Sequence, residues 1–229
     1  MNLESFTAEF ETLARSGDAS RILGEGEALL SRLALETDFV DECLTRILTD
    51  NDFMSRQRES VWPNEITLFR HPEKVFSLLM YIWETGLADI VHDHSAWGIV
   101  CTARGKLEEV KYRRLDDGTR GGHAELAQNR TVTLGPGETT SILPLDRGIH
   151  RMRNIHEGLT VTLNVYGRPE KRGFIRFFDL ETNTYKEAYP PGTLKRVLAA
   201  RALLEHSGKA EQVLRQALDM PLPKSILDE

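Results

Sequence analysis

Cysteine is scarce in this chain of 229 residues, which contains only Cys43 and Cys101. Two cysteines so far apart in the sequence provide neither a disulfide framework nor the paired spacing of a zinc ribbon. A reducing, cytoplasmic location is therefore expected.

Long hydrophobic runs are also missing. No apolar stretch approaches the roughly 20 residues that a membrane-spanning helix needs. The first residues, Met-Asn-Leu-Glu-Ser-Phe, lack the basic start and apolar core of a signal peptide. The formal net charge is −6, so the chain lacks the positive charge that favours nucleic acid or an anionic membrane. Neither is expected as a partner.

The remaining composition is that of a globular protein, with 40% hydrophobic and 28% charged residues. We predict an N-terminal helical extension over residues 1–64, a β-barrel over 65–190 and C-terminal helices within 191–229. The C-terminal helices are expected over 194–204 and 210–218. One β-domain with helical extensions is the simplest organisation.

Hydrophobic residues recur at helical spacing in the first 50 residues. Asp18 is the predicted N-cap of one helix, and Asp38 that of the next. Gly24 and Gly26 count against the first of these helices, because glycine destabilises a helix interior.

From Glu65 the pattern changes to short segments rich in Val, Ile, Thr, Phe and Tyr, separated by Gly, Pro and Asp turns. Such a pattern predicts a mainly β sandwich or barrel, a class that includes jelly rolls. The expected strands are 66–70, 75–83, 97–102, 107–113, 131–134, 139–143, 159–165, 174–179 and 184–188.

A His-Asp-His sequence interrupts this region at residues 92–94. Alternate residues of a strand point to the same face, so His92 and His94 are expected to converge while Asp93 points away. Two converging imidazoles are half of a metal site. Buried structural histidines also produce this pattern, so the motif needs a third ligand.

Two stretches carry spaced glycines and histidines: Gly86, His92, His94 and Gly105 in the first, and Gly137, Pro144, Gly148, His150 and Asn154 in the second. Together they resemble the opening and closing motifs of the cupin superfamily. An insertion between Gly137 and Pro144 and an altered Pro-to-Gly spacing depart from the strict pattern. The resemblance implies a cupin double-stranded β-helix (jelly-roll) barrel in which His92, His94 and His150 bind a metal ion.

The glutamate of the usual cupin opening motif is missing, because Gly98 and Ile99 occupy the positions where it falls. Three neutral imidazoles leave a divalent ion with its full charge, whereas a carboxylate ligand would reduce it. Such a centre is expected to attract an anionic chelating substrate, such as a thiolate, and to hold it deprotonated.

A three-histidine cupin with His-Asp-His followed by Trp97-Gly98 is similar to the thiol dioxygenases, that is, cysteine dioxygenase and the bacterial 3-mercaptopropionate dioxygenases. Phe69-Arg70 and then the segment from Phe76 to Trp83 precede the histidines in the order that this family has along its chain. The resemblance implies one Fe(II) per chain, no organic cofactor, and a small carboxylate-bearing thiol and O2 as substrates. The product would be a sulfinate, and the protein would be a monomer or homodimer.

The resemblance also implies roles for single residues. Tyr166 matches the catalytic tyrosine, and Arg70 falls near the arginine that pairs with the substrate carboxylate. Gly98 lies where the mammalian enzymes have a cysteine crosslinked to the tyrosine, so no crosslink is expected, and Cys101 should not replace it. Trp97 and Met152 are candidates for an apolar wall of the substrate site, although Trp97 could instead serve packing alone. Arg176 is a competing carboxylate partner.

The Ser-His-Tyr relay of the family corresponds here to Thr162, Asn164 and Tyr166, which would share one strand face. Asparagine can hydrogen-bond but cannot transfer protons as histidine does.

Several alternatives stay open. Tyr166 could be a core tyrosine and Arg70 a surface arginine. The chain could be another metal-dependent cupin enzyme, such as a dioxygenase that cleaves carbon–carbon bonds or an isomerase, or a non-enzymatic sensor of small ligands. Nickel, manganese and zinc also bind three imidazoles.

Overall fold

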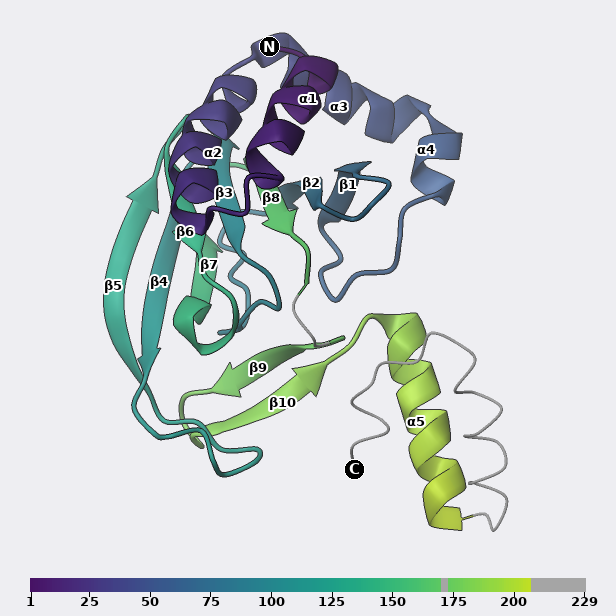
Figure 1. Ribbon diagram of the computed structural model, residues 1–229, viewed down its shortest axis with the longest axis vertical. Helices are drawn as coiled ribbons and strands as arrows, with labels where there is room; N and C mark the ends of the chain where they lie inside the picture. The colour runs from purple at the N-terminus through teal and green to yellow at the C-terminus, as the bar shows by residue number, and fades with distance from the viewer. Residues whose placement is uncertain (170–172, 207–229) are drawn as a thin grey trace.

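The computed structural model describes residues 1–169 and 173–206 (Figure 1). Four helices come first: α1 Leu3–Ala14, α2 Ala19–Ala34, α3 Thr37–Thr49 and α4 Asn51–Ser55. The strands follow, and helix α5, Pro191–His206, ends the described part. None of these helices combines the length and hydrophobicity needed to cross a membrane.

One sheet has five antiparallel strands in the order β1-β2-β8-β3-β6. Their bounds are β1 Glu65–Arg70, β2 Phe76–Trp83, β3 Gly98–Arg104, β6 Thr139–Ile142 and β8 Thr160–Gly167. The central position of β8 follows from its composition, since its β-branched and aromatic residues pair with both β2 and β3.

The opposite side is built from two smaller groups of strands. One has the order β5-β4-β7, with β4 Leu107–Arg114, β5 Leu126–Leu134 and β7 His150–Asn154. The other pairs β9, Ile175–Asp179, with β10, Thr184–Ala188. The segment around His92 lies between them, because His92 makes antiparallel bridges to both His150 and Phe177. The two histidine motifs are thereby joined through the backbone.

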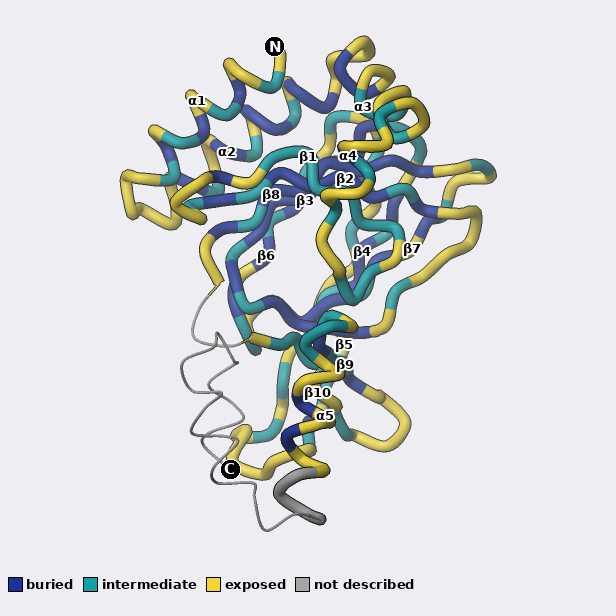
Figure 2. Tube along the Cα trace, turned by 90° about the vertical axis from the view of Figure 1, so that its right-hand side faces the viewer, coloured by how far each residue is buried: buried dark blue, intermediate teal, exposed yellow. Residues whose placement is uncertain are grey.

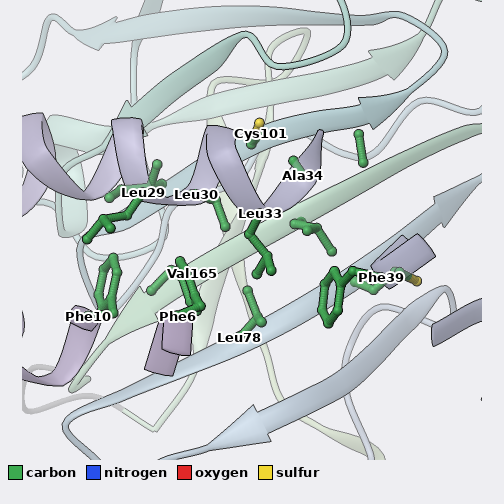
Figure 3. Packing of buried hydrophobic residues seen from close by; sticks show 14 of the residues in the cluster. Phe6, Phe10, Leu29, Leu30, Leu33, Ala34, Phe39, Leu78, Cys101 and Val165 are labelled. Atoms are coloured by element: carbon green, nitrogen blue, oxygen red, sulfur yellow. The ribbon is translucent and has the colours of Figure 1, made fainter. Parts of the chain in front are cut away.

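The five-stranded sheet has a hydrophobic core on each face. Helices α1 to α3 cover the outer face, where Phe10 and Leu33 pack in one cluster with Leu78 and Val165 (Figure 3). On the inner face, Leu79 and Val100 pack with side chains from β4, β5 and β7. Figure 2 shows buried residues concentrated in the sheet and on the inner sides of the helices.

The fold is a mainly β sandwich with helices at its ends, as the sequence predicted. Asp18 caps α2, since its carboxylate accepts from Arg21 N. Gly26, which counted against this helix in the sequence, lies within α2. A Cβ there would lie 2.7 Å from Ile99 Cδ1, so glycine lets α2 approach β3 closely.

Some predicted boundaries were wrong. Asp38 is not an N-cap, because α3 begins at Thr37 after Glu36, and Asp38 lies in its first turn. Strand β5 begins at Leu126, five residues before the predicted start, because its first half is polar and largely exposed at a sheet edge. Strand β7 was missed, since arginines separate its buried residues. The helix predicted over 210–218 lies outside the described residues.

Candidate metal centre

The three predicted ligands converge. His92 and His94 lie in the connection from β2 to β3, and His150 is the first residue of β7. The backbones of His92 and His150 donate to each other's carbonyl oxygens at 2.8 and 2.9 Å, which fixes the two motifs side by side. The Nε2 atoms lie 3.0 Å apart for His92 and His94, 2.9 Å for His94 and His150, and 3.2 Å for His92 and His150.

Hydrogen bonds among the rings do not explain this convergence. His92 Nδ1 lies 2.8 Å from Ile90 O, and His150 Nδ1 lies 2.7 Å from Glu109 Oε1. Both oxygens only accept, so each Nδ1 carries the ring's proton and each Nε2 presents a lone pair. Burial lowers the pKa of His92 well below its usual value and keeps this imidazole neutral. Two lone pairs directed at one point call for a cation.

The spacing of the nitrogens fits a metal ion. Imidazole nitrogens bound at about 2.1 Å lie about 3.0 Å apart when the bonds are at right angles, and about 3.4 Å apart in a tetrahedron. The observed separations match the first arrangement, in which three ligands occupy one face and leave the opposite face for other ligands. Three neutral imidazoles suit Fe(II), Mn(II), Ni(II) or Zn(II). Asp93 points away as expected, and its carboxylate accepts from Arg176 N at 2.8 Å.

Glu109, on β4, is a site residue that the sequence prediction missed. It is completely buried, and its carboxylate accepts from His150 Nδ1 at 2.7 Å and from Thr140 Oγ1 at 2.6 Å. Burial raises the pKa of Glu109, but His150, Lys111 and Thr140 outweigh this effect and lower it overall, so Glu109 is ionised. The alternation of side chains along β4 could have predicted that Glu109 points inward, because it shares a strand face with the buried Leu107.

Glu109 adds a charge behind the centre that the sequence did not predict. The missing glutamate of the opening motif predicted three neutral ligands that leave a divalent ion its full charge, and the three histidines are that set. The Glu109 carboxylate lies one hydrogen bond behind His150. Such a carboxylate orients the imidazole and makes it a stronger donor to the metal. Among the described residues, the group placed to hold an ion consists of the three histidines alone.

Tyr166 lies over the histidines. Its ring stacks on that of His94, with centroids 5.1 Å apart and planes 21° apart. Gly98 pairs with Tyr166 across β3 and β8, and a Cβ at Gly98 would lie 2.6 Å from Tyr166 Cε1. Glycine at this position therefore leaves room for the ring. Burial raises the pKa of Tyr166, so its hydroxyl stays protonated.

Cys101 lies on the other side of the sheet from Tyr166. It is buried among the residues under α2, near Ala34 (Figure 3). This position agrees with the expectation that it does not replace the crosslinking cysteine.

Thr162, Asn164 and Tyr166 share one face of β8, as predicted. Asn164 Nδ2 donates to the Tyr166 hydroxyl at 3.2 Å. The Thr162 hydroxyl accepts instead from Trp83 Nε1 at 3.2 Å. Thr162 therefore holds an aromatic wall in place rather than extending a chain to Asn164.

Two adjoining cavities lead to the histidines. The inner one, of about 230 Å³, is lined by all three histidines, Asn164 and several apolar side chains, among them Met152. The outer one, of about 480 Å³, contains three cationic residues, Arg58, Arg70 and Lys74. The residues that line both cavities are Val61, Trp62, Tyr81, His94 and Tyr166.

The other predicted substrate residues are placed differently. Arg70, at the end of β1, lines the outer cavity. Trp97 lines neither cavity. It packs instead on Phe10 and against Gly167 on the helix side of the sheet. Arg176 is paired with Asp146 at 3.2 Å and lies over the ring of Tyr185, also outside both cavities.

Comparisons with known proteins do not identify a family for this chain. No model of a known protein family matches the sequence. A cupin 2 domain-containing protein from Halorhodospira halophila is similar at 16% identity over 52% of this chain and 72% of its own, with a TM-score of 0.39. A cupin 2 conserved barrel domain protein from Salinispora arenicola is similar at 15% identity over 48% of this chain and 81% of its own, with a TM-score of 0.34.

Oxalate decarboxylase from Bacillus subtilis is similar at 22% identity over 42% of this chain and 22% of its own, with a TM-score of 0.32. Likenesses this weak bear on neither substrate nor mechanism.

Proposed function

We propose that this protein is a mononuclear non-haem Fe(II) thiol dioxygenase, which adds both atoms of O2 to the sulfur of a small carboxylate-bearing thiol. The observation that carries the proposal is the histidine face itself. Three buried imidazoles converge without a carboxylate among them, and a protonated tyrosine lies against one of the rings. The opposite face of such an ion is open to a chelating anion.

The two cavities suit a substrate with a soft anionic end and a carboxylate. Arg70, with Arg58 and Lys74 nearby, would attract the carboxylate, for which the planar guanidinium is well shaped. The sulfur end would lie in the inner cavity, where Trp62 and Met152 exclude water. Tyr166 would donate a hydrogen bond to oxygen or to the substrate beside His94.

Bound Fe(II) would supply the redox chemistry that joins thiolate and O2. One thiolate and one O2 give one sulfinate, and the sulfur supplies all the electrons that O2 takes up, so no further reductant is needed. The residues of the chain hold the reactants together, keep Tyr166 protonated and orient His150 through Glu109. We propose a cytoplasmic monomer or homodimer that acts on small molecules.

The test is oxygen uptake by protein loaded anaerobically with Fe(II), with cysteine, 3-mercaptopropionate and cysteamine as separate substrates. Formation of a sulfinate from one of them, in step with oxygen uptake, is the expected result. His94→Ala should abolish it, and His156→Ala, which changes an exposed histidine, should not. Three inert thiols, or turnover of a β-diketone or quercetin in their place, would contradict the proposal.

A further inference from the structure

The side-chain amide of Asn164 is placed to contact whatever occupies the inner cavity. Asn164 lies in the middle of β8 between Leu79 of β2 and Val100 of β3, and only 2% of its surface is exposed. Its side chain lines the same cavity as the three histidines. Each end of its amide therefore needs a partner within the site.

One end of the amide is already used, because Asn164 Nδ2 donates to the Tyr166 hydroxyl at 3.2 Å. An amide nitrogen donates and an amide oxygen accepts, so this contact fixes the orientation of the Asn164 side chain.

The carboxamide oxygen then remains. Asn164 Oδ1 is buried and has no hydrogen-bond partner among the described residues. A buried acceptor without a donor is unfavourable unless a ligand or water satisfies it. Since the oxygen lies at the wall of the histidine cavity, the donor that fits it is a group of the bound ligand.

We propose that Asn164 Oδ1 selects ligands that carry an amino group next to their metal-binding atom. This inference rests on the proposed function and narrows its substrate to thiols that bear an amine as well as a carboxylate. The three cations of the outer cavity would hold the anionic end of the ligand, and Asn164 would hold the amine. Asn164 is then a specificity-determining residue rather than a proton carrier.

The experiment compares two thiols that differ only in the amine, L-cysteine and 3-mercaptopropionate. Their binding to the Fe(II)-loaded protein is measured by calorimetry without oxygen, so turnover plays no part. Asn164→Ala should weaken cysteine binding by about tenfold, the usual effect of one lost hydrogen bond to a charged group, and should change 3-mercaptopropionate binding by less than about twofold. Asn164→Asp, which keeps an acceptor oxygen, should retain the preference.

Asn64→Ala is the matched control. Asn64 lines the same cavity, but its amide already donates to Ile82 O at 3.2 Å, so its loss should leave the ratio of the two affinities unchanged. An equal loss of affinity for both thiols in Asn164→Ala would overturn the role of Asn164 and leave the dioxygenase proposal standing. If neither thiol binds to the unaltered protein, the proposed function fails, and the amine selection fails with it.

Discussion

The two faces of strand β8 have different compositions and different neighbours. Val161, Leu163 and Val165 point to the helices and are packed into a continuous apolar core. Thr162, Asn164 and Tyr166 alternate with them on the opposite face, where hydrogen bonds hold them, and Asn164 and Tyr166 line the histidine cavity. The two faces of β8 therefore have different roles. Its helix face stabilises the fold, and its cavity face arranges polar groups beside the candidate metal site.

This separation predicts that substitutions on one face leave the other largely intact. The largest effect is expected at the ligands. His150→Ala removes one of three converging nitrogens and should lower metal affinity by at least about 100-fold. Metal content after anaerobic reconstitution and desalting measures it, with His156→Ala as control. Equal metal content in the two variants would show that the triad is not the binding site.

Leu163→Ala changes the helix face. Its side chain is fully buried, so the cavity it leaves should lower the free energy of unfolding by about 2–5 kcal/mol. Urea denaturation of the metal-free protein measures this loss. Metal content of the folded protein should not change. A parallel fall in metal affinity would mean that the two faces are coupled.

Glu109→Gln keeps the size of the side chain and removes its charge. It should lower metal affinity by about 10–100-fold, because a neutral amide accepts less strongly from His150. Competition with a chelator provides the measurement. Glu108→Gln is the control, since Glu108 lies on the other face of β4 and pairs with Arg153 at the surface. Equal affinities for both variants would exclude Glu109 from the centre.

The smallest effect is expected at Cys101, on the same face of the sheet as Leu163. Cys101→Ala should cost about 1 kcal/mol of stability through lost packing. The site should be unaffected, and intact-mass measurement of the unaltered protein should show no loss of hydrogen from a Cys–Tyr crosslink. A crosslinked species that disappears in Cys101→Ala would contradict the placement of this cysteine behind the sheet.

Sequence patterns predicted much of this arrangement, because period-two alternation and glycine-bounded strands are local properties. Alternation predicted that His92 and His94 converge and that Thr162, Asn164 and Tyr166 share one strand face, whereas His150 was expected only from the resemblance to cupins. Contacts between distant strands cannot be predicted from such local patterns. Glu109 meets His150 through the pairing of β4 with β7, and β7 itself was not predicted.

Trp97 is a residue that the local sequence placed at the site and that the fold places elsewhere. Its position beside the histidine motif suggested a substrate wall, but the chain has already turned toward the helices there. Phe10 and Gly167 provide a place for its ring on that side. Arg176 likewise lies on a predicted strand, yet Asp146 holds it outside the cavities.

X-ray absorption spectroscopy of the Fe(II)-loaded protein shows what surrounds the ion before and after substrate is added. We expect scattering from three imidazoles in the free protein, and a sulfur atom bound to iron once cysteine is added without oxygen. An iron site without imidazole scattering, or one that gains no sulfur from cysteine, would contradict this expectation.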